Sequence, residues 1–480
     1  MTGTPSPSRP LLVGVAVGDV TPPAGIDVAG FCLRLTTRGV HRSLRAGVAT
    51  FSDGERTACL VTCDLLGFTV PYATALRSEI AARLGIAADG VLLAASHTHS
   101  APALSLELKI GGRQDEWTPL EETYERFWRA KVLALCQEAL RSAVPARLAA
   151  SRDGSAAIGL NRRVRLPDGR MIIGRTKDRP ADHSVGVVRV DRLDGGPLLA
   201  ILNYACHPIS LGPEAEVVSP DYPGAARETL EAVTGAPALF VQGAGGDIAP
   251  ADGMGPDPSI ADLLGRTLGL EAAKVWSTIE TRNLERREEI VQSYNPIAGL
   301  VKIEHPLPDA RVRYAAETLA LPLETPPTPE EAEAIARRAD ERLVTLVAED
   351  APEGALNIGR IETRWGRMLR RRAAEGTLGD ATAIGVVQVV RVNDVVFVAL
   401  PVEPFVLIGH GIIGAIDPER TIICGYANGT IGYCPMPEDY PEGGYEVERA
   451  HHLYGQPAAL APTVAPFLVD EATRLAAALA

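Results

Sequence analysis

The sequence predicts a mixed α/β (α+β) fold: one large domain of mixed β-sheets flanked by helices. Short apolar segments of strand type alternate with longer segments in which apolar residues recur at every third or fourth position. Glycine, proline and aspartate clusters separate these segments, as expected for turns. Apolar residues make up 46% of the 480 residues and charged residues 22%, which is ordinary for a folded globular protein with a sizeable core.

In the first half of the chain, strands are expected where β-branched and other apolar residues form short runs that end at turn residues. The expected strands cover residues 11–17, 48–51, 58–64, 91–95, 146–150, 186–190 and 198–204. The Ser52–Glu55 turn between the second and third of these strands indicates a hairpin. Helical periodicity predicts helices over 72–84 and 120–143.

The second half continues the mixture of strands and helices. Strands are expected over 238–242, 384–392 and 395–400, and helices over 222–233, 259–279 and 329–348. Thr328-Pro329-Glu330-Glu331 has the form of a capping box with proline at the first helical position. We therefore expect a flexible tail over residues 1–10 and a single domain over 11–480, with a helical insertion at 325–380.

Charge and cysteine content exclude several classes of protein. The charge balance is 47 − 60 = −13, which disfavours binding to nucleic acid. No window approaches 18 uninterrupted apolar residues, so no membrane span is predicted, and the first residues lack the apolar stretch of a secretory signal. Seven dispersed cysteines do not resemble a disulfide framework. These features predict a cytoplasmic protein, and they leave its oligomeric state open.

Candidate site residues stand where predicted strands end, the position at which α/β proteins place functional side chains. His97 and His99 follow one strand and, at positions i and i+2, face the same side of an extended segment. His207 follows another strand and Glu403 a third. Imidazole and carboxylate groups together favour a metal such as zinc. From spacing alone, hydrogen-bonded loop histidines and a solvated glutamate remain open alternatives.

A fourth predicted strand ends in the glycine-rich segment 243–246, followed by Asp247. The Lys-Ser/Thr of a phosphate-binding P-loop is missing here. We therefore expect the glycines to permit a close approach of the backbone or to form an anion-binding nest, rather than to bind a nucleotide.

Six segments, in order along nearly the whole chain, resemble the neutral (alkaline, non-lysosomal) ceramidases and their shorter bacterial relatives. These segments are 13–23, 96–102 (Ser-His-Thr-His-Ser-Ala-Pro), 161–162, 242–250, 400–403 (Leu-Pro-Val-Glu) and 432–440. The resemblance implies a neutral-ceramidase-like fold and a hydrolase that cleaves a C–N bond. It corresponds to the family's catalytic domain without the C-terminal immunoglobulin-like domain.

In that family two histidines, a glutamate and a tyrosine hold one zinc ion. The resemblance assigns these roles to His97, His207, Glu403 and Tyr433. It further implies that His99 is a hydrogen-bonding or acid–base residue and that Arg162 contacts the substrate. Separately from the resemblance, Asp247 is a candidate catalytic residue, as an alternative proton carrier to His99.

The sequence departs from the family in ways that bear on the substrate. Ala249 replaces the family's active-site serine, and larger polar residues replace its pattern around 445–452. We therefore expect zinc-dependent hydrolysis of a small soluble amide by metal-activated water, rather than of ceramide. Three alternative functions remain open. An esterase would use the same groups, and the alanine at position 249 is also compatible with a homologue that binds a ligand without catalysis. The third alternative is a lyase that uses the metal as a Lewis acid.

Other polar residues receive mainly structural interpretations. Asp64 is expected either to orient a ligand histidine or to cap a strand end, and Asp221 to be the N-cap of the following helix. The adjacent residues His451 and His452 are expected to line a pocket wall rather than to bind a metal together. A solvated helix face is predicted for the arginines at 367, 370, 371 and 372.

Overall fold

A strongly curved eight-stranded sheet is the largest feature of the computed structural model, which describes residues 9–31, 36–109, 116–292, 294–379 and 381–480. In spatial order its strands are β12 (Ala238–Gln242), β10 (Pro197–Tyr204), β9 (Ser184–Arg192), β6 (Val144–Ser155), β1 (Leu11–Asp19), β3 (Arg45–Ser52), β4 (Thr57–Cys63) and β5 (Val91–Ala95). The neighbours β10/β12 and β4/β5 are parallel and the others antiparallel. The sheet curves so far that its edge strands β12 and β5 come into contact.

A four-stranded sheet packs against the inner face of this curved sheet. Its strands are β16 (Val312–Pro322), β17 (Thr382–Val392), β18 (Val395–Ala399) and β20 (Thr421–Cys424). Side chains alternate between the two faces of each strand. In β4, Leu60 therefore points into the core between the sheets while Val61 points to the opposite face, and in β18 Phe397 and Val398 divide in the same way.

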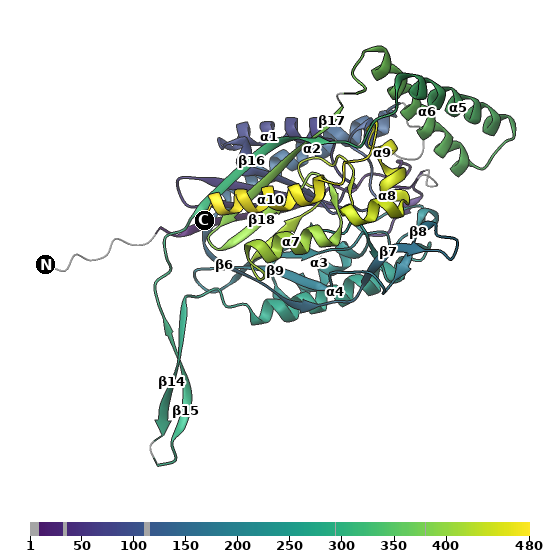
Figure 1. The fold of residues 1–480 in the computed structure, drawn as a ribbon. Helices are drawn as coiled ribbons and strands as arrows, with labels where there is room; N and C mark the ends of the chain where they lie inside the picture. Colours follow the sequence, from purple (N-terminus) through teal and green to yellow (C-terminus); the bar gives the residue numbers. More distant parts are fainter. Residues whose placement is uncertain (1–8, 32–35, 110–115, 293, 380) are drawn as a thin grey trace.

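Helices cover the outer faces of both sheets (Figure 1). Helices α1 (Val70–Leu84), α2 (Pro119–Arg141), α3 (Tyr222–Thr234) and α4 (Pro258–Thr278) cover the larger sheet, and α7 (Val406–Ile416) and α10 (Val464–Ala478) cover the smaller one. The prediction of mixed sheets flanked by helices is confirmed.

Two excursions leave this core (Figure 1). Strands β14 (Leu284–Gln292) and β15 (Ile297–Glu304) form a long two-stranded arm that the sequence analysis did not anticipate. Helices α5 (Pro329–Ala348) and α6 (Glu353–Ala374) form a hairpin between β16 and β17, inside the region where a helical insertion was expected. The treatment of 11–480 as one domain stays a prediction, and residues 1–8 of the expected tail lie outside the described residues.

Small sheets complete the region around the predicted site. Strand β7 (Gly159–Arg165) lies between β8 (Met171–Thr176) and β13 (Ile248–Pro250), and β19 (Glu403–Pro404) pairs in parallel with β21 (Tyr433–Cys434). A further short pair joins β2 (Gly39–Val40) and β11 (Val217–Val218). No helix in the described segments is both long and apolar enough to cross a membrane.

Candidate metal centre

The curvature of the larger sheet brings the predicted strand ends together. His97 follows β5, His207 follows β10, and Glu403 lies beyond β18 in the smaller sheet. Because β5 and β12 touch across the open side of the curved sheet, the ends of β5 and β10 face each other rather than lying a sheet's width apart. The pairing of β19 with β21 then places Glu403 beside Tyr433.

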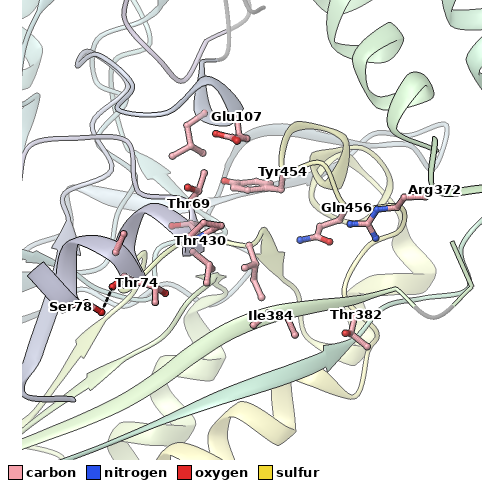
Figure 2. A pocket seen from close by; sticks show the side chains of 15 residues that line it. Thr69, Thr74, Ser78, Glu107, Arg372, Thr382, Ile384, Thr430, Tyr454 and Gln456 are labelled. Atoms are coloured by element: carbon pink, nitrogen blue, oxygen red, sulfur yellow. Dashed lines mark hydrogen bonds between the residues drawn. The ribbon is translucent and has the colours of Figure 1, made fainter. Parts of the chain in front are cut away.

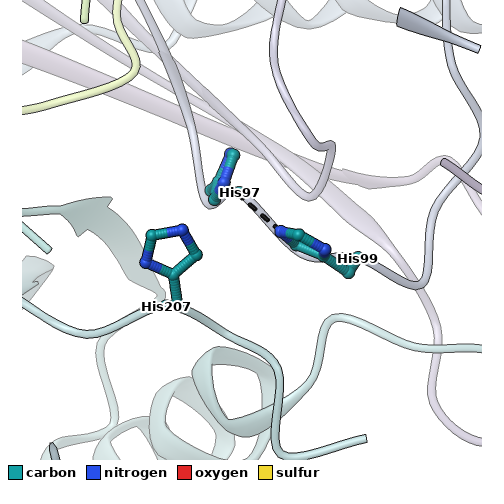
Figure 3. Close-up of side chains that lie close together, drawn as sticks. All are labelled: His97, His99 and His207. Carbon is teal, nitrogen blue, oxygen red and sulfur yellow. Dashed lines mark hydrogen bonds between the residues drawn. The ribbon is translucent and has the colours of Figure 1, made fainter. Parts of the chain in front are cut away.

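His97 and His207 lie close together (Figure 3), and a backbone carbonyl orients each ring through its Nδ1 atom. The Nδ1 atoms of His97 and His207 lie 2.6 Å from the carbonyl oxygens of Leu66 and Gly245, respectively. A carbonyl only accepts hydrogen bonds, so Nδ1 carries the proton in both rings, and in the neutral imidazoles Nε2 presents a lone pair. Backbone carbonyls bonded in this way fix the orientation of metal-binding histidines.

Glu403 and Tyr433 complete the cluster. Glu403 Oε2 lies 3.2 Å from His97 Nε2 and 3.0 Å from His207 Nε2, and the Tyr433 hydroxyl lies 3.2 Å from His207 Nε2. Ligand atoms around a tetrahedral zinc ion, with bonds of about 2.0–2.1 Å, are separated by about 3.3 Å. These three separations between predicted ligands therefore fit a small tetrahedral metal ion.

The charges of these groups call for a cation. Burial lowers the pKa of His207 to about 4, so this imidazole is neutral. Burial acts to raise the pKa of Glu403, but the neighbouring His97 and His207 side chains lower it well below its usual range. Where both imidazoles are neutral and turn Nε2 lone pairs toward the Glu403 carboxylate, this buried arrangement is favourable only with a cation between them.

Tyr433 is the least conventional of the four groups. Burial raises the pKa of its phenol well above the usual value, and the Arg162 guanidinium opposes this increase. The guanidinium lies over the Tyr433 ring at 5.1 Å from its centroid. Without a metal the phenol is therefore protonated, and a bound cation would have to favour the phenolate for Tyr433 to act as an anionic ligand.

His99 stands at the edge of the cluster. Its Nε2 lies 3.3 Å from His97 Nε2 (Figure 3), and His97, His99 and His207 offer nitrogen atoms within 4.8 Å of one another. Burial lowers the pKa of His99 well below its usual value, and the two neighbouring histidines add to this effect. Gly30 permits the close packing of this ring, because a Cβ there would lie 2.5 Å from His99 Nδ1.

A buried ion pair holds Arg162 against the metal cluster. Its Nε donates to Glu446 in α8 (Tyr445–Glu448) at 2.8 Å, and its Nη1 lies 3.2 Å from His207 Nε2. Arg163 donates to the other oxygen of Glu446, also at 2.8 Å. Arg162 Nη2 is buried without a hydrogen-bond partner in the described part of the chain, so the N–H groups of this nitrogen remain for a ligand.

Asp247 lies behind the cluster rather than in it. Its carboxylate accepts hydrogen bonds at 2.8 Å from Asn161 Nδ2 and from the Val406 amide. Burial raises its pKa to about 7, although the Val406 and Asn161 hydrogen bonds oppose the change. A catalytic role for Asp247 stays a prediction, because no described contact joins it to the four predicted ligands.

The glycine-rich segment serves close backbone packing, as the sequence analysis expected. A Cβ at Gly246 would lie 2.6 Å from the carbonyl oxygen of Glu403, and the Gly246 amide donates to the Pro404 carbonyl at 2.8 Å. Gly245 supplies the carbonyl that orients His207. The segment therefore supports two of the predicted metal ligands from behind.

Backbone strain marks the same region. His97 has a left-handed conformation with φ of +68°, and Tyr426, which stacks on its ring at 4.1 Å, has φ of +56°. Such conformations in residues other than glycine cost about 1–3 kcal/mol each and concentrate at functional sites. The surrounding structure therefore holds His97 in this orientation at the expense of some stability.

Several polar residues from the sequence analysis have structural roles. Asp64 accepts two hydrogen bonds from Arg227, at 2.8 and 2.6 Å, so the interpretation that it orients a ligand histidine is wrong. Asp221 caps α3, as predicted. His452 stacks on Trp365 at 3.7 Å, with His451 beside it, and His452 lines a cavity with this tryptophan.

Sequence reasoning missed Tyr454, whose hydroxyl donates a hydrogen bond to Glu403 Oε1. It also missed Tyr426, although this residue follows the strand β20 and the strand-end signal applied to it. Glu446 lies in the segment noted only for its departure from the family pattern. Tyr454 has no comparable signal, since it follows a single helical turn, α9 (Ala450–Leu453).

Comparisons with known proteins agree with this geometry at the level of the fold. No family model and no curated protein matches the sequence. A solved structure described as a ceramidase complexed with C2 superposes with a TM-score of 0.68 at 16% identity, covering 98% of this chain and 75% of its own. The neutral ceramidase from Pseudomonas aeruginosa gives 0.66 and 18%, covering 98% and 74%.

The fold and the cluster define an α/β protein with a buried group of three histidines that could hold a metal ion, beside a carboxylate and a tyrosine. The chain has the neutral ceramidase fold over nearly its whole length, which confirms the resemblance noted in the sequence at the level of the fold.

Proposed function

We propose that this protein is a metal-dependent hydrolase that cleaves an amide C–N bond. One observation carries the proposal: the Nε2 atoms of His97 and His207 meet the ionised Glu403 carboxylate and the Tyr433 hydroxyl at separations suited to a tetrahedral cation. The shared fold with ceramidases, which are amide hydrolases, supports the choice of reaction.

Zinc is the ion that this donor set fits best. Neutral imidazoles and oxygen ligands in a four-coordinate site are typical of zinc, and one ion per chain satisfies the four groups. A zinc ion in such a site polarises a carbonyl and lowers the pKa of water to about 7.

Two side chains beside the ligands are suited to the rest of the reaction. His99 is suited to accept a proton and to deliver it to the leaving amine, since its Nε2 lies 3.3 Å from Nε2 of the predicted ligand His97. Arg162 presents an unused donor that can bind a carboxylate or stabilise an oxyanion. Glu446 holds this guanidinium in place.

We further propose that the substrate is small and soluble and that water attacks it directly. Ala249, in β13, is 1% exposed and has no group that can attack a carbonyl or donate a proton. In the family that the sequence resembles, a serine at this position would supply the nucleophile or the proton donor. Because alanine replaces it, no acyl-enzyme is expected here.

Metal content tests the ligand assignment. We expect about one zinc ion per chain after purification, and its loss in the variants His97→Ala and His207→Ala. His410→Ala, which removes an exposed histidine on α7, is the matched control and should retain the metal. Full metal content in both ligand variants would refute the assignment.

Turnover of paired amides and esters tests the reaction. Hydrolysis in heavy-oxygen water should place one solvent oxygen in the acid product within a single turnover, with no transfer to added hydroxylamine. His99→Ala should lower kcat by roughly 10²–10⁴-fold while the metal is retained. An ester preference would favour the esterase alternative, and an acyl adduct would contradict direct attack by water. Ceramide in detergent micelles should be cleaved more slowly than a soluble amide.

A further inference from the structure

Two adjoining cavities lie next to the metal centre, on the far side of Tyr454. The first, of about 650 Å³, lies among the start of α1, the start of β17 and the Thr430–Ile431 loop (Figure 2). The second, of about 400 Å³, lies between α6 and the 452–455 segment. Glu107, Arg372 and Tyr454 line both cavities, and each volume falls within the range of about 300–1,000 Å³ usual for small-molecule sites.

The two cavities differ in chemical character. The first is lined mainly by aliphatic and hydroxyl side chains, including Val70, Leu108 and Ile384, which suits an apolar chain. In the second, Trp365 and Met368 stand beside the arginines at 364, 371 and 372. Glu107 is the single acidic residue among the described residues that line either cavity, so the second cavity has an excess of positive charge.

Two of these arginines lack the ion pairs that their neighbours make. Arg367 lies 3.7 Å from Asp340, and Arg370 pairs with Glu333 at 2.8 Å, so these two form the solvated, paired helix face that the sequence predicts. Within the described segments, no carboxylate pairs with Arg371 or Arg372. Both line the second cavity: Arg371 lies at an exposed position, as expected for the solvated helix face, and Arg372 is half-buried.

Tyr454 connects this region to the metal centre. Its ring forms part of the wall of both cavities, and its hydroxyl donates to Glu403. Trp365 anchors the segment from the other side, since its Nε1 donates to the Gln456 carbonyl at 2.8 Å. An occupant of the cavities would therefore touch the residue that hydrogen-bonds a predicted metal ligand.

We propose that the two cavities form one binding site for an amphiphile with an anionic head group, such as a medium-chain carboxylate. The apolar chain occupies the first cavity, and Arg371 and Arg372 bind the head group in the second. The juxtaposition of an apolar groove with two arginines that lack carboxylate partners carries this assignment. The proposal concerns binding, so metal content and turnover can fail without affecting it.

Calorimetric titration of the full chain with dodecanoate and with uncharged dodecanol tests the site. We expect saturable binding and a preference for dodecanoate. The double variant Arg371→Gln/Arg372→Gln should weaken dodecanoate binding by about 10-fold to 100-fold, the usual effect of a lost charge-assisted hydrogen bond, and leave dodecanol binding unchanged. Arg367→Gln removes a paired charge from the same helix and should change neither affinity.

A second variant tests the apolar cavity. Ala75 lies on the exposed surface of α1 and lines the first cavity, so Ala75→Phe should fold and weaken the binding of both ligands. Any of three results would overturn the proposal. These are no saturable binding of dodecanoate, a dodecanoate affinity of the double arginine variant equal to that of the parent, and a loss of affinity in Arg367→Gln equal to that in the double variant. If dodecanoate binds and inhibits hydrolysis competitively, the ligand is an arm of the substrate or the acid product; binding without inhibition assigns a separate ligand. Both results support the site.

Discussion

Replacement of Tyr454 by phenylalanine should weaken metal binding without unfolding the protein. The Tyr454 hydroxyl donates to Glu403 Oε1, while Oε2 faces the histidines. Glu403 is only 1% exposed, so water cannot readily replace the lost donor. Loss of a hydrogen bond to a charged group costs about 1.5–3 kcal/mol, which corresponds to a metal affinity about 10-fold to 100-fold lower.

Competition with a chromogenic chelator measures this affinity directly. Tyr426→Phe is the matched control, because the Tyr426 ring also packs on the site but its buried hydroxyl has no hydrogen-bond partner in the described segments. We expect Tyr426→Phe to bind the metal as the parent does and to be no less stable. Parental affinity in Tyr454→Phe, or an equal loss in both variants, would refute the reasoning.

Three further predictions concern groups around the cluster. Gly30→Ala should lower kcat by about 10-fold to 100-fold while the metal is retained. The new methyl group displaces His99, and the backbone φ of +110° disfavours alanine. Steady-state kinetics measures the loss of kcat, and elemental analysis checks the metal content. The raised pKa of Asp247, about 7, means that the folded protein keeps a proton that the unfolded chain releases near pH 4. The free energy of unfolding should therefore fall as pH rises from about 4 to about 7, and urea unfolding of Asp247→Asn should lack this contribution. Glu446→Gln should destabilise the protein by about 3–5 kcal/mol in urea, since it leaves the buried Arg162 without a carboxylate partner; a midpoint equal to that of the parent would contradict this.

The strand pattern explains why much of the site was predictable. Buried strands leave a strong signal in short runs of β-branched residues, and their ends are where α/β proteins expose functional groups. His97, His207 and Glu403 each follow such a run, so their convergence required only that the sheets bring these ends together. The strong curvature that does so depends on contacts between distant strands, which no local pattern records.

Other parts of the structure depend on long-range contacts alone. Strand β14 is largely charged and exposed, so no apolar strand signal marked it, and the more apolar β15 is held in place by its pairing with β14. Tyr454 acquires its role from a residue 51 positions away, and Glu446 from one 284 positions away. Single helical turns such as α8 and α9 are also too short to produce a recognisable periodicity.

The segment from Tyr433 to Tyr454 connects the features on which these proposals rest. Tyr433 faces His207, Glu446 holds Arg162 beside the same histidine, and Tyr454 hydrogen-bonds the carboxylate. Next to Tyr454 on this segment, His452 stacks on Trp365 of the α5–α6 hairpin. The larger polar residues at 445–452 that depart from the family pattern are therefore in structural use: they anchor a guanidinium at the metal cluster and attach the hairpin that forms the second cavity. A difference in substrate between this protein and the ceramidases is accordingly expected to depend on this segment and the hairpin packed against it, while the predicted metal ligands stay the same.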